Sequence, residues 1–101
     1  MNAPVFAIAI SGSDIYLGGQ FTTANNGLTP RNYAAAVDTS GTLTAWNPNL
    51  SNSVYALAIN GSTVYIGGGF SSIGGSSLFS YFGPVDLTLG NPITSQALTI
   101  P

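Results

Sequence analysis

The sequence predicts an all-β fold, and three observations lead to this prediction. The stretch Val5–Phe21 recurs as Val54–Phe70 at an offset of 49 residues, and ten of the 17 aligned positions are identical. Both stretches consist of short β-branched, aromatic and small apolar runs bounded by glycine-containing turns, which is typical of strands. No segment of the 101 residues has the apolar periodicity of an amphipathic helix.

Each repeat begins with an apolar strand. Val5–Ile10 and its equivalent Val54–Ile59 are continuously apolar and too short for helices, so we expect strands that are buried on both faces. Glycine-containing turns follow at 11–14 and 60–63, where glycine supplies the positive φ of a hairpin.

The second strand of each repeat ends in a pair of glycines. These strands are expected at Ile15–Leu17 and Val64–Ile66. Paired glycines lack Cβ atoms and therefore allow a close backbone approach or a bulge. A tyrosine lies at the centre of each strand, and we expect it to pack between the repeats. The residues of this structural signature are Tyr16, Gly18 and Gly19 in the first repeat and Tyr65, Gly67 and Gly68 in the second.

Two further strands complete each repeat. A polar loop separates the second strand from a third, expected at Tyr33–Val37 and Phe79–Val85. Asp38 and Asp86 then open turns, in which an aspartate accepts local backbone N–H bonds and a glycine takes the left-handed conformation. The expected fourth strands are Thr42–Trp46 in the first repeat and Ile93–Ile100 in the second.

One such repeat resembles a blade of a kelch-type β-propeller, in which a strand ending in two glycines is followed by a spaced tyrosine and tryptophan. Here these are Gly18-Gly19, Tyr33 and Trp46. The whole unit is more similar to the blades of bacterial extracellular propeller repeats. The resemblance implies two four-stranded antiparallel blades, residues 1–50 and 51–101. The second blade departs from the pattern because no tryptophan corresponds to Trp46.

The composition excludes several classes of function. Only 4% of the residues are charged, one arginine and three aspartates, against about 25% in an average soluble protein. Nucleic-acid binding is therefore not expected. The chain has no His or Cys, so neither a usual zinc or iron site nor a bound cofactor is expected. Nucleophile–base pairs are nearly unavailable, and we expect no enzymatic activity. The longest apolar run, Pro4–Ile10, is shorter than the roughly 18 residues of a membrane helix.

A few residues are candidates for ligand binding. Trp46 is a possible sugar-stacking platform, although a blade tryptophan more often packs in a core. Arg31, the only cation, and Asn32 lie at the end of the long loop and are candidates to contact a ligand. Asp38 and Asp86 are either a calcium or acid–base pair or two turn residues; the repeat explains both as turn residues.

Two blades do not make a propeller, which needs about 4 to 8. We expect the open apolar faces to be covered by other copies of the chain, or by neighbouring blades of a longer parent chain. Three copies would close a six-bladed ring and four an eight-bladed ring, and a rotation that does not close would give a filament. Alternatively, the segment 95–101 is a strand donated to a neighbour's sheet edge.

The sequence thus predicts a structural, self-assembling repeat module. The alternatives are a lectin-like or protein-binding propeller module, with a glycan as ligand, and a propeller segment of a larger secreted enzyme. The low charge and the abundance of Ser, Thr and Asn resemble secreted bacterial β-proteins. We therefore expect an extracellular or cell-surface location in a bacterium or archaeon.

Overall fold

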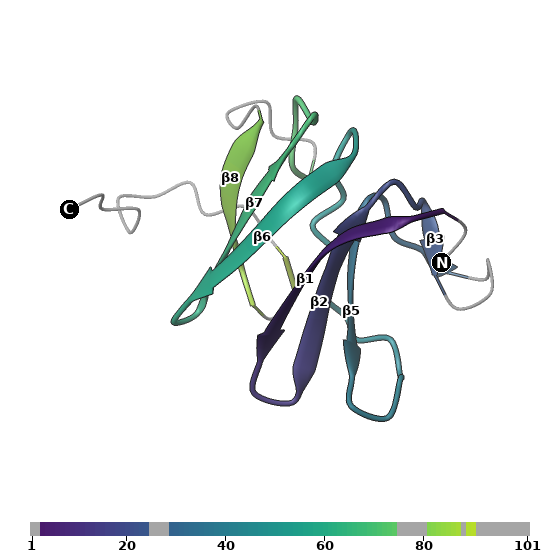
Figure 1. Cartoon of the computed structure of the whole chain (residues 1–101), viewed down its shortest axis with the longest axis vertical. Coiled ribbons are helices and arrows are strands. Elements are labelled where there is room, and N and C mark those ends of the chain that lie inside the picture. The colour runs from purple at the N-terminus through teal and green to yellow at the C-terminus, as the bar shows by residue number, and fades with distance from the viewer. Residues whose placement is uncertain (1–2, 25–28, 75–80, 88, 91–101) are drawn as a thin grey trace.

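The computed structural model describes residues 3–24, 29–74, 81–87 and 89–90, and this part of the chain is all-β, without a helix. It forms three antiparallel sheets, two of which lie side by side with β1 and β6 adjacent (Figure 1). The first sheet has the order β1 (Val5–Ser11), β2 (Asp14–Gly19), β5 (Ala34–Asp38); the second pairs β3 (Thr23–Ala24) with β4 (Thr29–Pro30); the third has the order β6 (Val54–Asn60), β7 (Thr63–Gly68), β8 (Phe82–Asp86).

The two three-stranded sheets have the same register. Ile8 pairs with Leu17 in the first sheet, and the equivalent Leu57 pairs with Ile66 in the other. In both sheets the register shifts near the start of the first strand, between Val5 and Ala7 and between Val54 and Ala56, opposite the paired glycines. The sequence repeat is therefore a structural repeat, and we call residues at matching register positions equivalent.

The prediction of a fourth strand at Thr42–Trp46 is wrong. Leu43 forms only an isolated bridge with Val37. The pairing ends because the chain turns towards the second repeat, where the indole of Trp46 donates a hydrogen bond to the carbonyl of Asp86. The sheet of the first repeat therefore has three strands where four were expected.

Other differences lie in the connections. The polar loop after β2, expected to be irregular, contains the short β3–β4 hairpin, in which Thr23 pairs with Pro30. The third strands end one residue later than predicted, because β5 extends to Asp38 and β8 to Asp86. The predicted strand Ile93–Ile100 and the proposed donated segment 95–101 lie outside the described residues.

The core lies between the two three-stranded sheets. The first sheet contributes small residues and one tyrosine, and the second contributes larger aliphatic residues. Trp46 and Phe70 close the space between the sheets from the connecting segments, and both are fully buried. The central residues of the core are Tyr16, Ala34, Ala36, Trp46, Val54, Val64, Ile66, Phe70 and Val85.

The expectation that Val5–Ile10 is buried on both faces is wrong for this chain alone. Ala9 packs against the core, but Ile8 and Ile10 on the opposite face are 63% and 68% exposed. The apolar character of β1 therefore exceeds what packing within one chain requires.

Candidate functional site

Two open apolar sheet faces are the main surface feature of the described chain. We call the outer surface of β1, β2 and β5 the head face, and the outer surface of β6, β7 and β8 the tail face. Register places each set on one side of its sheet, because directly opposed residues share a face. The head face consists of Ile8, Ile10, Ile15, Leu17, Ala35 and Val37, and the tail face of Ala56, Ala58, Tyr65, Gly67, Phe82 and Pro84. Ala35 and Pro84 are buried, whereas Ile8, Ile10 and Phe82 are the most exposed large side chains of the two faces.

The two faces are equivalent to the two sides of the contact already present inside the chain. In that contact, the inner face of the first sheet carries Ala9 and Tyr16, and their equivalents on the tail face are Ala58 and Tyr65. The inner face of the second sheet instead carries aliphatic residues whose equivalents form the head face. These aliphatic residues are Leu57, Ile59, Val64, Ile66 and Val85.

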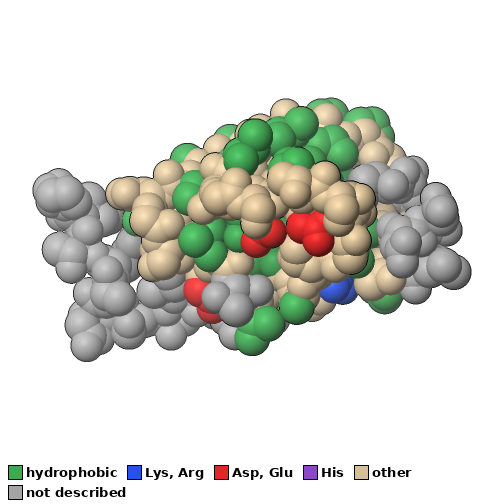
Figure 2. All heavy atoms as spheres, turned by 90° about the horizontal axis from the view of Figure 1, so that it is seen from below, with side chains coloured by type: hydrophobic (Ala, Val, Ile, Leu, Met, Phe, Trp, Pro, Cys, Tyr) green, Lys and Arg blue, Asp and Glu red, His purple; other side chains and the backbone are tan. Residues whose placement is uncertain are grey.

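Burial differs sharply between equivalent residues. Val54 is fully buried, whereas Val5 is 36% exposed. Leu57 and Ile59 pack against the core, whereas their equivalents Ile8 and Ile10 are among the exposed large hydrophobic residues. The same sequence pattern is thus covered in one copy and uncovered in the other. Figure 2 shows hydrophobic side chains gathered along one rim of the molecule, with acidic side chains nearer its centre.

The paired glycines have different neighbours in the two repeats. A Cβ atom placed on Gly18 would overlap Val54 Cγ1 and lie 3.0 Å from Val54 Cβ, so glycine is required there for the sheets to meet. A Cβ atom on Gly67 would have only ordinary contacts, at 3.7 Å from Ala56 Cβ and 3.8 Å from the Tyr81 carbonyl. Nothing within the described chain requires glycine at position 67.

The second glycine of each pair has an internal role. A Cβ atom on Gly19 would overlap the carbonyl oxygen of Pro4, and one on Gly68 would overlap that of Ser53. The residue after each glycine donates to the same carbonyl, Gln20 to Pro4 at 3.0 Å and Gly69 to Ser53 at 2.9 Å. Each repeat therefore needs this glycine for its own first strand to approach.

Tyr16 and Trp46 fill the contact between the sheets. Their rings meet edge to face at a centroid distance of 4.9 Å. The Tyr16 hydroxyl donates to the Leu87 carbonyl at 2.9 Å, and Trp46 Nε1 donates to the Asp86 carbonyl at 2.8 Å. Burial raises the pKa of Tyr16, with smaller contributions from the charges of Asp14 and Asp86. Both side chains thus join the two repeats by packing and by hydrogen bonds.

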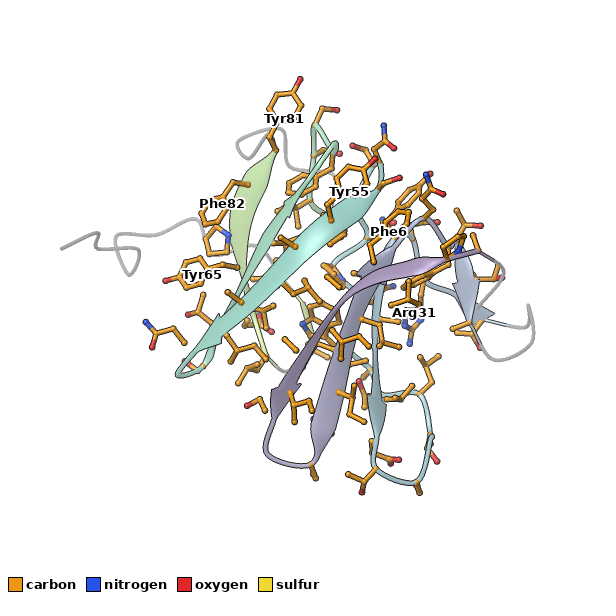
Figure 3. The ribbon with its side chains drawn as sticks, in the orientation of Figure 1. Phe6, Arg31, Tyr55, Tyr65, Tyr81 and Phe82 are labelled. Carbon is orange, nitrogen blue, oxygen red and sulfur yellow. The ribbon has the colours of Figure 1, made fainter. Side chains whose placement is uncertain are left out.

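The tyrosine of the second repeat has a different partner. Tyr65 stacks on Phe82 at a centroid distance of 5.8 Å and an interplanar angle of 10°. These two residues lie on the side of the second sheet away from the first, as Figure 3 shows. Phe82 occupies the position equivalent to Ala34, since both face the first glycine of the pair. It is 57% exposed, so it presents an aromatic surface on the tail face.

The candidate ligand residues are engaged within the chain. Trp46 is fully buried, so its ring has no free face on which a sugar could stack. Arg31 donates to the carbonyls of Pro30 and Thr44, and its Nε is buried without a partner among the described residues. Asn32 donates to the side chain of Asn49 at 2.7 Å. The structure does not bring Trp46 together with Arg31 and Asn32 on an open surface.

Asp38 and Asp86 both organise turns. Asp38 Oδ1 accepts hydrogen bonds from the hydroxyl and amide of Ser40 and from the amide of Thr42. These bonds, that of the Ser40 hydroxyl first, lower the pKa of Asp38. Asp86 Oδ1 accepts from the amides of Leu89 and Gly90. Within the described residues no group of three or more His, Cys, Asp or Glu side chains could hold a metal ion.

Sequence reasoning missed the exposed aromatic residues. Phe6 and Tyr55 are equivalent and stack on one another at a centroid distance of 5.4 Å, across the gap between β1 and β6 (Figure 3). The repeat alignment contained the necessary signal, because it places an aromatic residue at the same position of each first strand. Phe82 carried no such signal, since its equivalent is an alanine.

Comparison of this chain with family models, curated proteins and solved structures gives no match. In the described part of the chain, no helix is long and apolar enough to cross a membrane. The geometry of the two open faces is therefore the basis for assigning a function.

Proposed function

We propose that this chain is a structural, self-assembling repeat module of β-propeller type. Its two three-stranded sheets pack against one another with β1 and β6 adjacent, and the open faces continue that packing into a closed ring or a filament. The proposed location is extracellular or at the cell surface, which fits the low charge of the chain. The role requires no catalytic residue and no cofactor.

One observation carries the proposal: equivalent residues are buried in one repeat and exposed in the other. Ile10 is 68% exposed, whereas its equivalent Ile59 packs against the core. Complete burial of an isoleucine side chain stabilises a protein by about 1.5–3 kcal/mol. Covering Ile8 and Ile10 would therefore supply a substantial part of the free energy of association.

The low charge supports the same role. With a formal net charge of −2 at pH 7, the molecules repel one another only weakly. Exposed apolar surface of this kind marks sites of interaction. A lectin-like module is less well supported, because Trp46 is buried and Arg31 and Asn32 bond to their own chain.

Light scattering on the purified chain, with negative-stain imaging of the same sample, tests the proposal. We expect particles of several times 10.3 kDa, either discrete rings or fibres. Rings of three or four copies would give six or eight sheets around one axis, and fibres would mean that the rotation does not close. A chain that remains a monomer at millimolar concentration would contradict the proposal.

A further inference from the structure

We infer that the occupant of each open face is a second copy of this chain, bound head to tail, with Val5 of one copy packed over Gly67 of the next. This inference rests on the proposed function and specifies its contact. The head face of one molecule meets the tail face of another, so the interface is heterologous: two different surfaces meet, and every molecule retains one of each.

The contact inside the chain shows how the two surfaces fit. There, Val54 packs directly over Gly18, and a side chain at Gly18 would overlap Val54 Cγ1. Val54 is fully buried by this contact. A strand glycine weakens a sheet unless a close approach requires it, and at Gly18 the approach of Val54 is that requirement.

The same pair of positions is open at the two ends of the molecule. At Gly67, equivalent to Gly18, a Cβ would have only ordinary contacts, and Val5, equivalent to Val54, is 36% exposed. A second copy placed as the second repeat is placed on the first would bring its Val5 over Gly67. This placement explains both the glycine at position 67 and the exposed valine at position 5.

The polar groups of the tail face fit the same placement. The hydroxyl of Tyr16 donates to the carbonyl of Leu87, the residue after the turn aspartate of the second repeat. Tyr65 is equivalent to Tyr16, and Thr39 is the residue after the turn aspartate of the first repeat. Head-to-tail stacking therefore offers Tyr65 the Thr39 carbonyl of the next copy.

A contact between two like faces lacks these features. Two head faces would place Ile8 and Ile10 against their own copies and leave Val5 without a glycine partner. The tail face, with Phe82 57% exposed, would remain uncovered. The heterologous contact covers both faces and repeats the valine–glycine and tyrosine positions of an interface that the chain already forms, with Phe82 in the place of Ala34.

Two single substitutions each block one face. Ile10→Asp places a charge on the head face at a residue that is 68% exposed, so we expect the variant to fold. Gly67→Val fills the space above Gly67 on the tail face, where the nearest atoms to a Cβ lie at 3.7 and 3.8 Å. Ala58→Asp, at an exposed position, is a second tail variant should Gly67→Val fail to fold by circular dichroism.

Matched controls test whether the positions matter. Gly69→Gln introduces the residue found at the equivalent position 20, and the nearest atom to a Cβ at Gly69 is 3.9 Å away. Ser13→Asp adds a charge at the exposed tip of the β1–β2 turn, away from both faces. Both controls are expected to assemble as the original chain does.

The measurement is the mass of each variant alone and of the two mixed in equal amounts, by sedimentation velocity. We expect monomers of 10.3 kDa for each variant alone and a dimer of twice that mass for the mixture, because one intact head then meets one intact tail. A dimer formed by either variant alone, or full assembly of both tail variants, would overturn the head-to-tail inference while leaving self-assembly intact. A monomeric original chain would overturn the proposed function itself.

Discussion

At the scale of single residues, the backbone of two tyrosines is strained in the same way. Tyr33 and Tyr81 are equivalent and have φ values of 71° and 69°, in the left-handed region. This conformation costs a non-glycine residue roughly 1–2 kcal/mol. The amides of both tyrosines donate to a phenylalanine carbonyl, at 2.8 Å for Tyr33 to Phe21 and 2.9 Å for Tyr81 to Phe70. The strain is therefore a property of the repeat and is held by its hydrogen bonds.

The carboxylate of Asp38 should make the stability of the first repeat dependent on pH. Its pKa is lower in the folded chain than its ordinary value of 3.8, so the ionised form is favoured by folding. The stabilisation is fully present above pH 3.8 and is lost as the pH falls through the lower, folded value. We expect Asp38→Asn to lower the thermal midpoint at pH 7 and to have progressively less effect below pH 4.

The same turn provides a second variant for this test. Ser40→Ala removes the hydroxyl that contributes most to the lowered pKa of Asp38, so it should reduce the pH dependence between pH 4 and pH 2. The midpoints are measured by circular dichroism for the original chain and for each variant. A difference between the original chain and Asp38→Asn that is the same at every pH would show that the charge of Asp38 does not support the turn.

At the scale of elements, the contact between the two sheets is asymmetric. The first sheet presents alanines and Tyr16, and the second presents Val64, Ile66 and Val85. Small residues on one side allow the backbones to approach, while large residues on the other fill the space. Trp46 lies in the segment that follows β5 and closes this contact. Its Nε1 donates a hydrogen bond to the carbonyl of Asp86, the last residue of β8.

Substitutions in this contact should destabilise the whole chain. We expect Trp46→Ala to lower the free energy of unfolding by about 3–5 kcal/mol, since a large buried side chain is removed. Tyr16→Phe loses one partly buried hydrogen bond to Leu87 and should cost about 1 kcal/mol. Urea unfolding of each variant in the Ile10→Asp background measures these values without coupling to assembly.

Tyr55→Phe is the matched control for the hydroxyl. Tyr55 is 57% exposed, and Tyr55→Phe keeps the ring that stacks on Phe6 across the gap between β1 and β6. The Tyr55→Phe variant should therefore have the same urea midpoint of unfolding as the Ile10→Asp background. An effect of Tyr55→Phe as large as that of Tyr16→Phe would contradict the assignment of the Tyr16 hydroxyl to the joining of the two repeats.

At the scale of the whole molecule, the proposed role makes the chain one step of a stack. Its head and tail faces are open, and the strands that form them are more apolar than one chain needs. A molecule whose faces are covered by further copies is more stable than an isolated one, because association favours the folded state.

Thermal stability should therefore rise with protein concentration. We expect the thermal midpoint of unfolding to increase by several degrees between micromolar and millimolar concentrations of the chain, because association of folded molecules shifts the unfolding equilibrium towards the folded state. Ile10→Asp should remove this dependence and Ser13→Asp should retain it, when both are measured by scanning calorimetry. A midpoint that is independent of concentration in the original chain would indicate that association does not stabilise the fold.

Much of the local structure could be predicted from the sequence. The repeat at an offset of 49 residues, the first two strands of each copy and the turns at Asp38 and Asp86 follow from residue type and spacing alone. These features depend on neighbours along the chain: glycine takes a positive φ, an aspartate accepts nearby amides, and β-branched residues favour strands.

The remaining features depend on contacts between distant segments, which a single sequence does not specify. The segment Thr42–Trp46 pairs with β5 only at Leu43, because Trp46 is buried between the sheets and hydrogen-bonds to Asp86, so the expected fourth strand does not form. The sequence made Gly18 and Gly67 equivalent, but only the tertiary structure separates them: Gly18 is covered by Val54, and a Cβ at Gly67 would have only ordinary contacts. Local residue chemistry thus determined the repeat, whereas packing between the repeats decided which of its faces are covered.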